Sequence, residues 1–299
     1  MSLFQTYVMV DWSAASRPCQ GADSIWICLL ARGRDTTLPP LRYNPPTRHA
    51  AILRLEEILT DLLRRPGRIL VGFDFPLGYP AGFARSLGLS ATPWRAVWDR
   101  LAELVHDDAA NRNNRFEAAG RLNRRLSGNT FPFWGNHPAH RFDGLGRFRP
   151  TGYGNGGVAE RRLTEVRLKG PQPVWKLYGA GSVGGQALTG IARLRWLRHH
   201  PRLAPVTRIW PFETGLARLD EARAGDWRIV IAEVYPSLVR AQAEPGLVKD
   251  ARQLRSIAEH FAALDRRDAL NPLFAGDPAL SAAERRRVEE EEAWILGVV

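Results

Sequence analysis

The stretch Leu70-Val71-Gly72-Phe73-Asp74-Phe75-Pro76-Leu77-Gly78 joins an apolar run to an acidic residue and a turn. The run 68–73 has the length of a strand, and the acid, proline and glycine after it close that strand. The same order occurs near the start of the chain, in Val8-Met9-Val10-Asp11-Trp12-Ser13. Each segment therefore predicts a strand that ends at an aspartate.

The residues before the first stretch predict three strands and a helix. Extended runs rich in β-branched or aromatic residues lie at 6–10, 24–31 and 36–43. Residues 50–63 then carry apolar side chains at helical spacing, and Thr47 precedes them as a helix cap. The order strand, strand, strand, helix, strand predicts a single α/β domain with a mixed sheet.

The remainder of the chain divides into a helical segment and a second set of strands and helices. Helices are predicted at 94–106, 118–126, 247–264 and 281–296, and extended runs at 206–212 and 228–235. We expect residues 1–79 to form the first half of the core and residues 201–299 the second half. Residues 80–200 are expected to form a basic, helix-rich insertion or lid.

The composition is that of a folded protein with an excess of positive charge. The 299 residues include 42 Lys and Arg against 31 Asp and Glu, a formal charge of +11, and residues 101–200 hold 16 of these cations against 7 acids. Such a segment suits a surface that meets nucleic acid, DNA or RNA. Genome composition also favours arginine, however, and 39 of the 42 cations are arginine.

No apolar run reaches the ~20 residues that a membrane helix needs, and no targeting signal precedes the first strand. We therefore expect a cytoplasmic protein without a membrane partner. Its oligomeric state stays open.

Aromatic and basic residues alternate without a period between Phe131 and Arg149. Such a stretch can stack bases and contact phosphates, and it can equally be a loop that packs on its own rings. The residues expected to contact phosphate or nucleic acid are Arg141, Arg147, Arg149, Arg161 and Arg162.

The two strand-end acids are the main candidates for chemistry. If their strands are neighbours, Asp11 and Asp74 project at the carboxyl edge of the sheet, where ligand sites of open sheets gather. Two carboxylates placed so would bind magnesium or manganese together with water and substrate phosphate. An aspartate at a strand end can instead cap the following turn.

A third acid is expected further along the chain, from among Glu213, Glu233, Asp250 and Glu292. Glu233 is the strongest, because its apolar run requires a metal, an arginine or a hydrogen-bond partner, unless it faces outward. Asp250 could instead stabilise a helix start. The expected metal ligands are Asp11, Asp74 and Glu233, and the expected catalytic acids are these three and Asp250.

A glycine-rich segment, Gly179-Ala180-Gly181-Ser182-Val183-Gly184, has the spacing of a dinucleotide-binding turn. The run before it is a poor strand, and no acid follows at the distance at which a ribose ligand belongs. A phosphate-binding loop at the start of a helix is the alternative.

Several short motifs together resemble those of the predicted ribonuclease H-like nucleases of domain-of-unknown-function family 429. The matching segments, in chain order, are Val10-Asp11-Trp12-Ser13-Ala14-Ala15, Gly72-Phe73-Asp74-Phe75-Pro76-Leu77-Gly78, Gly181-Ser182-Val183-Gly184, Glu233-Val234-Tyr235-Pro236-Ser237 and Glu292-Ala293-Trp294-Ile295-Leu296-Gly297. The resemblance implies a ribonuclease H-like sheet of three antiparallel strands, a helix and then parallel strands. It also implies divalent-metal carboxylates, with Asp11 and Asp74 as ligands and Glu233 or Asp250 as the later acid.

The function that these observations predict is metal-dependent hydrolysis of phosphodiesters by a ribonuclease H-like nuclease. Two alternatives remain. A phosphotransferase or ATPase of the related actin-like class also places aspartates at strand ends, because a fold does not determine a function. A nucleic-acid-binding module without catalysis would keep the basic surface and lack a complete carboxylate cluster.

Overall fold

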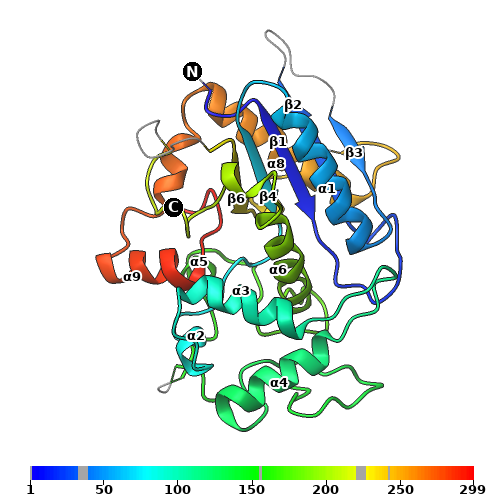
Figure 1. Cartoon of the computed structure of the whole chain (residues 1–299), viewed down its shortest axis with the longest axis vertical. Coiled ribbons are helices and arrows are strands. Elements are labelled where there is room, and N and C mark those ends of the chain that lie inside the picture. The colour runs from blue at the N-terminus through cyan, green and yellow to red at the C-terminus, as the bar shows by residue number, and fades with distance from the viewer. Residues whose placement is uncertain (1, 33–39, 155–156, 220–226, 242) are drawn as a thin grey trace.

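The computed structural model describes residues 2–32, 40–154, 157–219, 227–241 and 243–299. In this part of the chain a mixed sheet of six strands has the order β3-β2-β1-β4-β6-β5 (Figure 1). The strands are β1 Thr6–Asp11, β2 Trp26–Ala31, β3 Leu41–Tyr43, β4 Ile69–Phe73, β5 Thr207–Ile209 and β6 Ile229–Glu233. β1, β2 and β3 pair antiparallel, whereas β4, β5 and β6 run parallel to β1.

This architecture confirms the predicted α/β class and the mixed sheet. Helix α1, Arg48–Leu63, follows the three antiparallel strands, and the hydroxyl of Thr47 accepts a hydrogen bond from the backbone N–H of Ala50. That bond satisfies one of the free donors of the first helical turn, as the sequence predicts. Of the run predicted at 36–43, residues 36–39 lie outside the described part of the chain, and the remainder contains β3.

Side chains of the central strands alternate between two cores, because successive residues of a strand point to opposite faces. Val8, Val10, Val71 and Phe73 belong to one core, which we call the α6 face. The opposite core, which we call the α8 face, receives the intervening residues, among them Tyr7, Met9, Leu70 and Val230. The apolar runs of β1 and β4 are therefore buried on both sides, as expected for inner strands.

Residues 80–200 form helices, most of which pack on the α6 face. They are α2 Phe83–Ser86, α3 Pro93–Leu104, α4 Arg115–Ser127, α5 Leu163–Arg167 and α6 Gly184–Arg198. α3, α4 and α6 contribute buried residues to the same core as β1 and β4. The segment is thus packed into the domain, and the helix after the glycine-rich segment is α6.

A glycine in α6 sets how closely this helix approaches the sheet. A Cβ on Gly190 would lie 2.5 Å from the ring of Phe75, the residue after Asp74. Only glycine leaves room for that contact, so α6 lies directly against the turn that carries the second strand-end aspartate.

The opposite face is covered by α8, Lys249–Arg266, which packs on β1 and β2 and lies behind the sheet in Figure 1. Residues 294–298 complete this core. Ile295 forms an isolated parallel β-bridge with Glu233, and the N–H of Leu296 donates to the carbonyl of Glu233 over 2.9 Å.

The predicted last helix, 281–296, is shorter in the structure. α9 Ala282–Arg287 is continued by a π-helical turn, Val288–Glu292, and Ala293 then adopts a left-handed φ of 59° that ends the helix. Three short 3-10 helices complete the described elements, at Ala204–Val206, Pro236–Leu238 and Asn271–Ala275. None of the described helices is both long enough and apolar enough to cross a membrane.

Candidate metal and phosphate site

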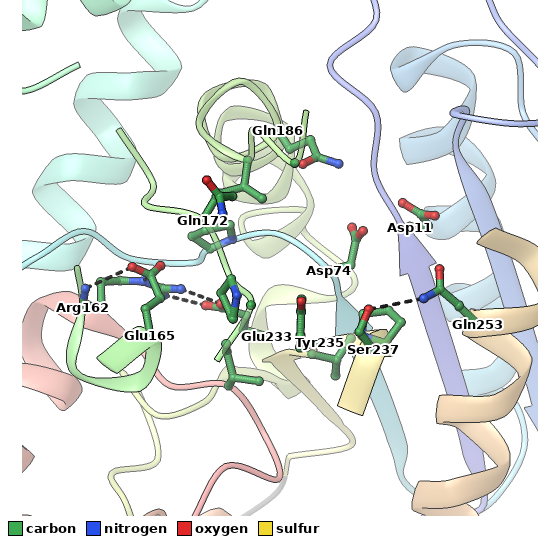
Figure 2. Close-up of a pocket in the computed structure, with 18 residues that line it drawn as sticks. Asp11, Asp74, Arg162, Glu165, Gln172, Gln186, Glu233, Tyr235, Ser237 and Gln253 are labelled. Atoms are coloured by element: carbon green, nitrogen blue, oxygen red, sulfur yellow. Dashed lines mark hydrogen bonds and ion pairs between the residues drawn. The ribbon is translucent and has the colours of Figure 1, made fainter. Parts of the chain in front are cut away.

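Asp11 and Asp74 meet at the carboxyl edge of the sheet. β1 and β4 are parallel neighbours, with Val10 opposite Phe73, so the two aspartates follow at the same level. The N–H of Trp12 donates to Oδ1 of Asp74 over 2.8 Å. Figure 2 shows both carboxyl groups at the ends of their strands, on the side of the same cavity.

The two carboxyl groups are held in each other's electrostatic field. Burial, followed by the charge of Asp74 and a hydrogen bond to it, raises the pKa of Asp11 well above its usual range. Burial also raises the pKa of Asp74 to about 6, although its hydrogen bonds with Asp11 and Trp12 oppose this shift. No described arginine, lysine or histidine forms an ion pair with either group. At neutral pH the pair therefore lacks a compensating cation.

A cavity of about 680 Å³ opens beside this pair. Its charged lining consists of four carboxylates, Asp11, Asp23, Asp74 and Asp250, and one guanidinium, that of Arg115. A second cavity of about 270 Å³ shares Asp11, Asp74, Gln186 and Gln253 with the first. The site is therefore a hollow with an acidic floor, although the protein as a whole is basic.

Glu233 does not join the pair, which differs from the predicted role as third metal ligand. Its two oxygens accept hydrogen bonds from Arg162 over 2.6 and 2.7 Å, and one also accepts the N–H of Leu77. The reason is register. Glu233 points to the same face as Ile229 and Ile231, which is the α6 face. Asp11 and Asp74 instead point to the same face as Met9 and Leu70, which is the α8 face.

Asp250 is the later acid that the fold brings to the site. It lies in the first turn of α8, on the face of the sheet shared by Asp11 and Asp74, and it lines the larger cavity. Its Oδ2 accepts the N–H of Asp23 over 3.0 Å, and its charge contributes to the raised pKa of Asp11.

The other two candidate acids lie elsewhere. Glu213 pairs with Arg198 over 2.7 Å, and buried Glu292 pairs with Arg287 over 2.7 Å. Neither lines the two cavities of the site.

The donor set fits a divalent cation with an incomplete protein shell. The described residues contain no group of three or more histidine, cysteine, aspartate or glutamate side chains close enough to hold one ion. Two touching carboxylates are nevertheless a sufficient protein contribution for Mg²⁺, which commonly keeps several waters and takes its remaining ligands from phosphate.

Most of the predicted phosphate-binding arginines have other roles. Arg162 is 1% exposed and binds Glu165 and Glu233, so its charge is already used within the protein, although it lines the smaller cavity. Arg149 binds Glu160, Arg161 donates to the carbonyl of Pro171, and Arg147 lies over the ring of Phe148. Neither these three nor exposed Arg141 lines the two cavities of the site.

Arg115 is the cation that lines the larger cavity, and no local sequence signal identifies it. It is the first residue of α4, and its Nη1 donates to Ser16 and Asn113 over 2.9 Å. Its Nε is buried without a hydrogen-bond partner among the described residues. Burial lowers the pKa of this guanidinium to about 10, and the nearby charge of Arg48 adds to the effect. The side chain is thus a charged donor that lacks an anion.

The glycine-rich segment lies beside Arg115. A Cβ on Gly185, in the first turn of α6, would lie 3.1 Å from Nε of Arg115. Gly179, Ser182 and Gly185 line the larger cavity, and no side chain caps the start of α6. The side chain of Gln186 donates to the carbonyl of Trp12 over 2.5 Å and joins α6 to the turn after Asp11.

Comparisons with known proteins leave this geometry as the basis for assigning a function, because the chain matches no protein-family model, no curated protein and no solved structure.

Proposed function

We propose that this protein is a divalent-metal-dependent phosphodiester hydrolase, a nuclease of ribonuclease H-like type. One observation carries the proposal. Asp11 and Asp74 share a cavity without forming an ion pair with a described cation, and Arg115, whose buried Nε has no hydrogen-bond partner among the described residues, lines the same cavity. The two carboxyl groups lack a cation and the guanidinium lacks an anion, so the site fits a metal ion and a phosphate group together.

The order of elements supports the ribonuclease H-like assignment. Three antiparallel strands, a helix and parallel strands occur in the order that the family resemblance implies, with metal-binding acids expected at the ends of β1 and β4. In the sheet, β6 lies between β4 and the edge strand β5. The later acid that fits this arrangement is Asp250 rather than Glu233.

Each group at the site has a defined task in this proposal. A bound magnesium or manganese ion would supply a Lewis acid that neutralises phosphate charge and makes water a stronger nucleophile. Asp11 and Asp74 hold the ion, and Arg115 and the first turn of α6 orient the phosphate. Gln186 fixes the position of α6 relative to the turn after Asp11. Water adds across one phosphorus–oxygen ester bond, with its oxygen on phosphorus and its proton on the leaving oxygen.

The balance of charges explains why a cation is required. The cavity has four carboxylates and one guanidinium, so it would repel a phosphodiester until positive charge is added. The protein as a whole carries a formal charge of +11, so its other surfaces are basic and would attract a polyanionic strand over a longer range.

The proposal is tested by incubating the purified protein with single-stranded and duplex DNA and RNA, with Mn²⁺ or with a chelator. We expect Mn²⁺-dependent cleavage that Asp11→Asn reduces at least a hundredfold. Asp61→Asn is the matched control, because Asp61 is exposed on α1 and pairs only with surface arginines. Cleavage that persists in Asp11→Asn at the wild-type rate contradicts the proposal.

Phosphotransfer is a second candidate, favoured by the glycine-rich segment directly before α6. Backbone donors at the start of a helix also suit the phosphates of a nucleoside triphosphate. Release of inorganic phosphate from ATP under the same conditions, without cleavage of nucleic acid, would support this candidate instead.

A further inference from the structure

An exposed aromatic ring lies at the wall of the larger cavity. Tyr178 lines this cavity together with Asp11, Asp74 and Arg115, and 41% of the residue is exposed. Its hydroxyl group forms no hydrogen bond with the described residues. Tyr178 therefore presents a large, partly exposed aromatic ring beside a polar, acidic hollow.

The backbone beneath the ring is fixed. The N–H of Leu177 donates to the carbonyl of Trp134 over 2.9 Å. Gly135 approaches so closely that a Cβ there would lie 2.8 Å from the backbone nitrogen of Tyr178. The ring of His137 packs against Tyr178 edge to face, with centroids 4.8 Å apart. Tyr178 is thus presented on a rigid support, which lowers the entropy lost when a second ring stacks on it.

The ring and the anion-binding groups follow each other along the chain. Tyr178 directly precedes the glycine-rich segment, which ends at the first turn of α6 beside Arg115. The cavity is therefore lined by an aromatic ring, by donors for a phosphate and by the carboxyl groups of Asp11 and Asp74. Its volume of about 680 Å³ is within the range of small-ligand sites.

We propose that the cavity binds a phosphoester that carries a nucleobase, and that Tyr178 selects it by stacking on the base. The inference rests on the proposed function and names its substrate class. Base stacking on an aromatic side chain tolerates any base, so the selection is for nucleotides over sugar phosphates rather than for one sequence.

Binding of two small probes tests the inference independently of turnover. Calorimetry in Mn²⁺ compares adenosine 5′-monophosphate with ribose 5-phosphate, which differ by the base. We expect the nucleotide to bind about tenfold more tightly to the wild-type protein, in line with one stacked base. Tyr178→Leu should reduce this ratio to about twofold or less, whereas Tyr178→Phe should keep it.

Phe148→Leu is the matched control, because Phe148 is 78% exposed but lies outside both cavities of the site. It should keep the wild-type ratio. A ratio near one in the wild-type protein, no binding of either probe at millimolar concentration, or an unchanged ratio in Tyr178→Leu would each overturn the inference.

The two proposals fail in different ways. If nucleotide preference depends on Tyr178 but no phosphodiester is cleaved with Mn²⁺, the hydrolase proposal fails and the nucleotide site stands. If nucleic acid is cleaved but the binding ratio does not depend on Tyr178, the hydrolase proposal stands and the nucleotide selection is wrong.

Discussion

Two acidic sites lie at the same edge of the sheet and differ in how their charge is compensated. Glu233 ends β6, is buried, and has both oxygens bound by Arg162. Asp11 and Asp74 end the neighbouring parallel strands β1 and β4, are half-buried, and face each other without a cation. Glu233 thus has a counter-charge within the protein, whereas Asp11 and Asp74 require one from outside.

This difference separates a structural acid from a functional one. A buried carboxylate that has its own arginine contributes to the fold, and removing either partner leaves an uncompensated charge. A carboxylate pair without a cation costs stability, and such a cost is typical of a binding site. The comparison can be tested by removing the arginine at one site and an aspartate at the other.

The largest change in stability is expected at Glu233, the acid that is paired with Arg162. Arg162→Met would leave the buried carboxylates of Glu165 and Glu233 without their cation. We expect the free energy of unfolding to fall by about 3–5 kcal/mol, measured by urea denaturation. Arg147→Met, at an exposed arginine without an acidic partner among the described residues, should change it by less than about 0.5 kcal/mol. Equal losses in the two variants would remove the distinction.

Removing a carboxylate from the pair should have the opposite sign. Asp74→Asn keeps an acceptor for the N–H of Trp12 but removes a carboxylate whose burial raises its pKa to about 6. In the presence of a chelator at pH 7, we expect this variant to be more stable than the wild-type protein by about 1–2 kcal/mol, after allowance for partial solvent exposure. A destabilised variant would show that the pair is a structural element.

The stability gain should depend on pH. Asp74 has a folded pKa of about 6, above the unfolded value of about 4. The folded state thus holds its proton more strongly, so the wild-type protein loses stability as the pH rises from about 4 through 6. Asp74→Asn should therefore show its full gain above pH 7 and almost none at pH 4. Chemical denaturation in chelator at both pH values measures this dependence.

Adding the missing cation should reverse the comparison. Mn²⁺ at ten times its dissociation constant should stabilise the wild-type protein by about 1.4 kcal/mol, because it binds the folded state alone. The same concentration should leave Asp11→Asn unchanged in a thermal shift assay. If both proteins are stabilised equally, the ion binds elsewhere.

The smallest effect is expected at the third acid. Asp250 lines the cavity and influences Asp11 through its charge, but it does not form a group of three close ligands with the pair. Asp250→Asn should weaken Mn²⁺ binding about threefold by calorimetry, equivalent to about 0.7 kcal/mol. A loss as large as that of Asp11→Asn would make Asp250 a direct ligand.

The sequence predicts those parts of the molecule that depend on local pattern. Apolar runs followed by an acid and a turn identify β1 and β4 and place Asp11 and Asp74 at one edge. The role of Glu233 depends on which face of β6 it occupies, and an apolar run on both faces carries no signal for this. The strand pairing places Val234, rather than Glu233, level with Asp74. This register cannot be read from the sequence before the pairing is known.

The cationic and aromatic parts of the site depend on contacts distant in sequence. Arg115 reaches the cavity because α4 begins beside the first turn of α6, about 70 residues later in the chain. Tyr178 is placed by a backbone contact with Gly135. Neither residue differs in its local sequence from the many other arginines and aromatic residues of residues 101–200, so charge counting pointed to arginines that have other partners.

The late position of residues 294–298 has a consequence for synthesis of the protein. They complete the α8 face and bond to the end of β6, next to the buried Glu233. On the ribosome, the sheet can pair its strands well before these residues emerge, yet one side of it stays incompletely covered. Nascent chains are therefore expected to expose apolar surface to chaperones until residues 294–298 have been synthesised and have packed on the sheet.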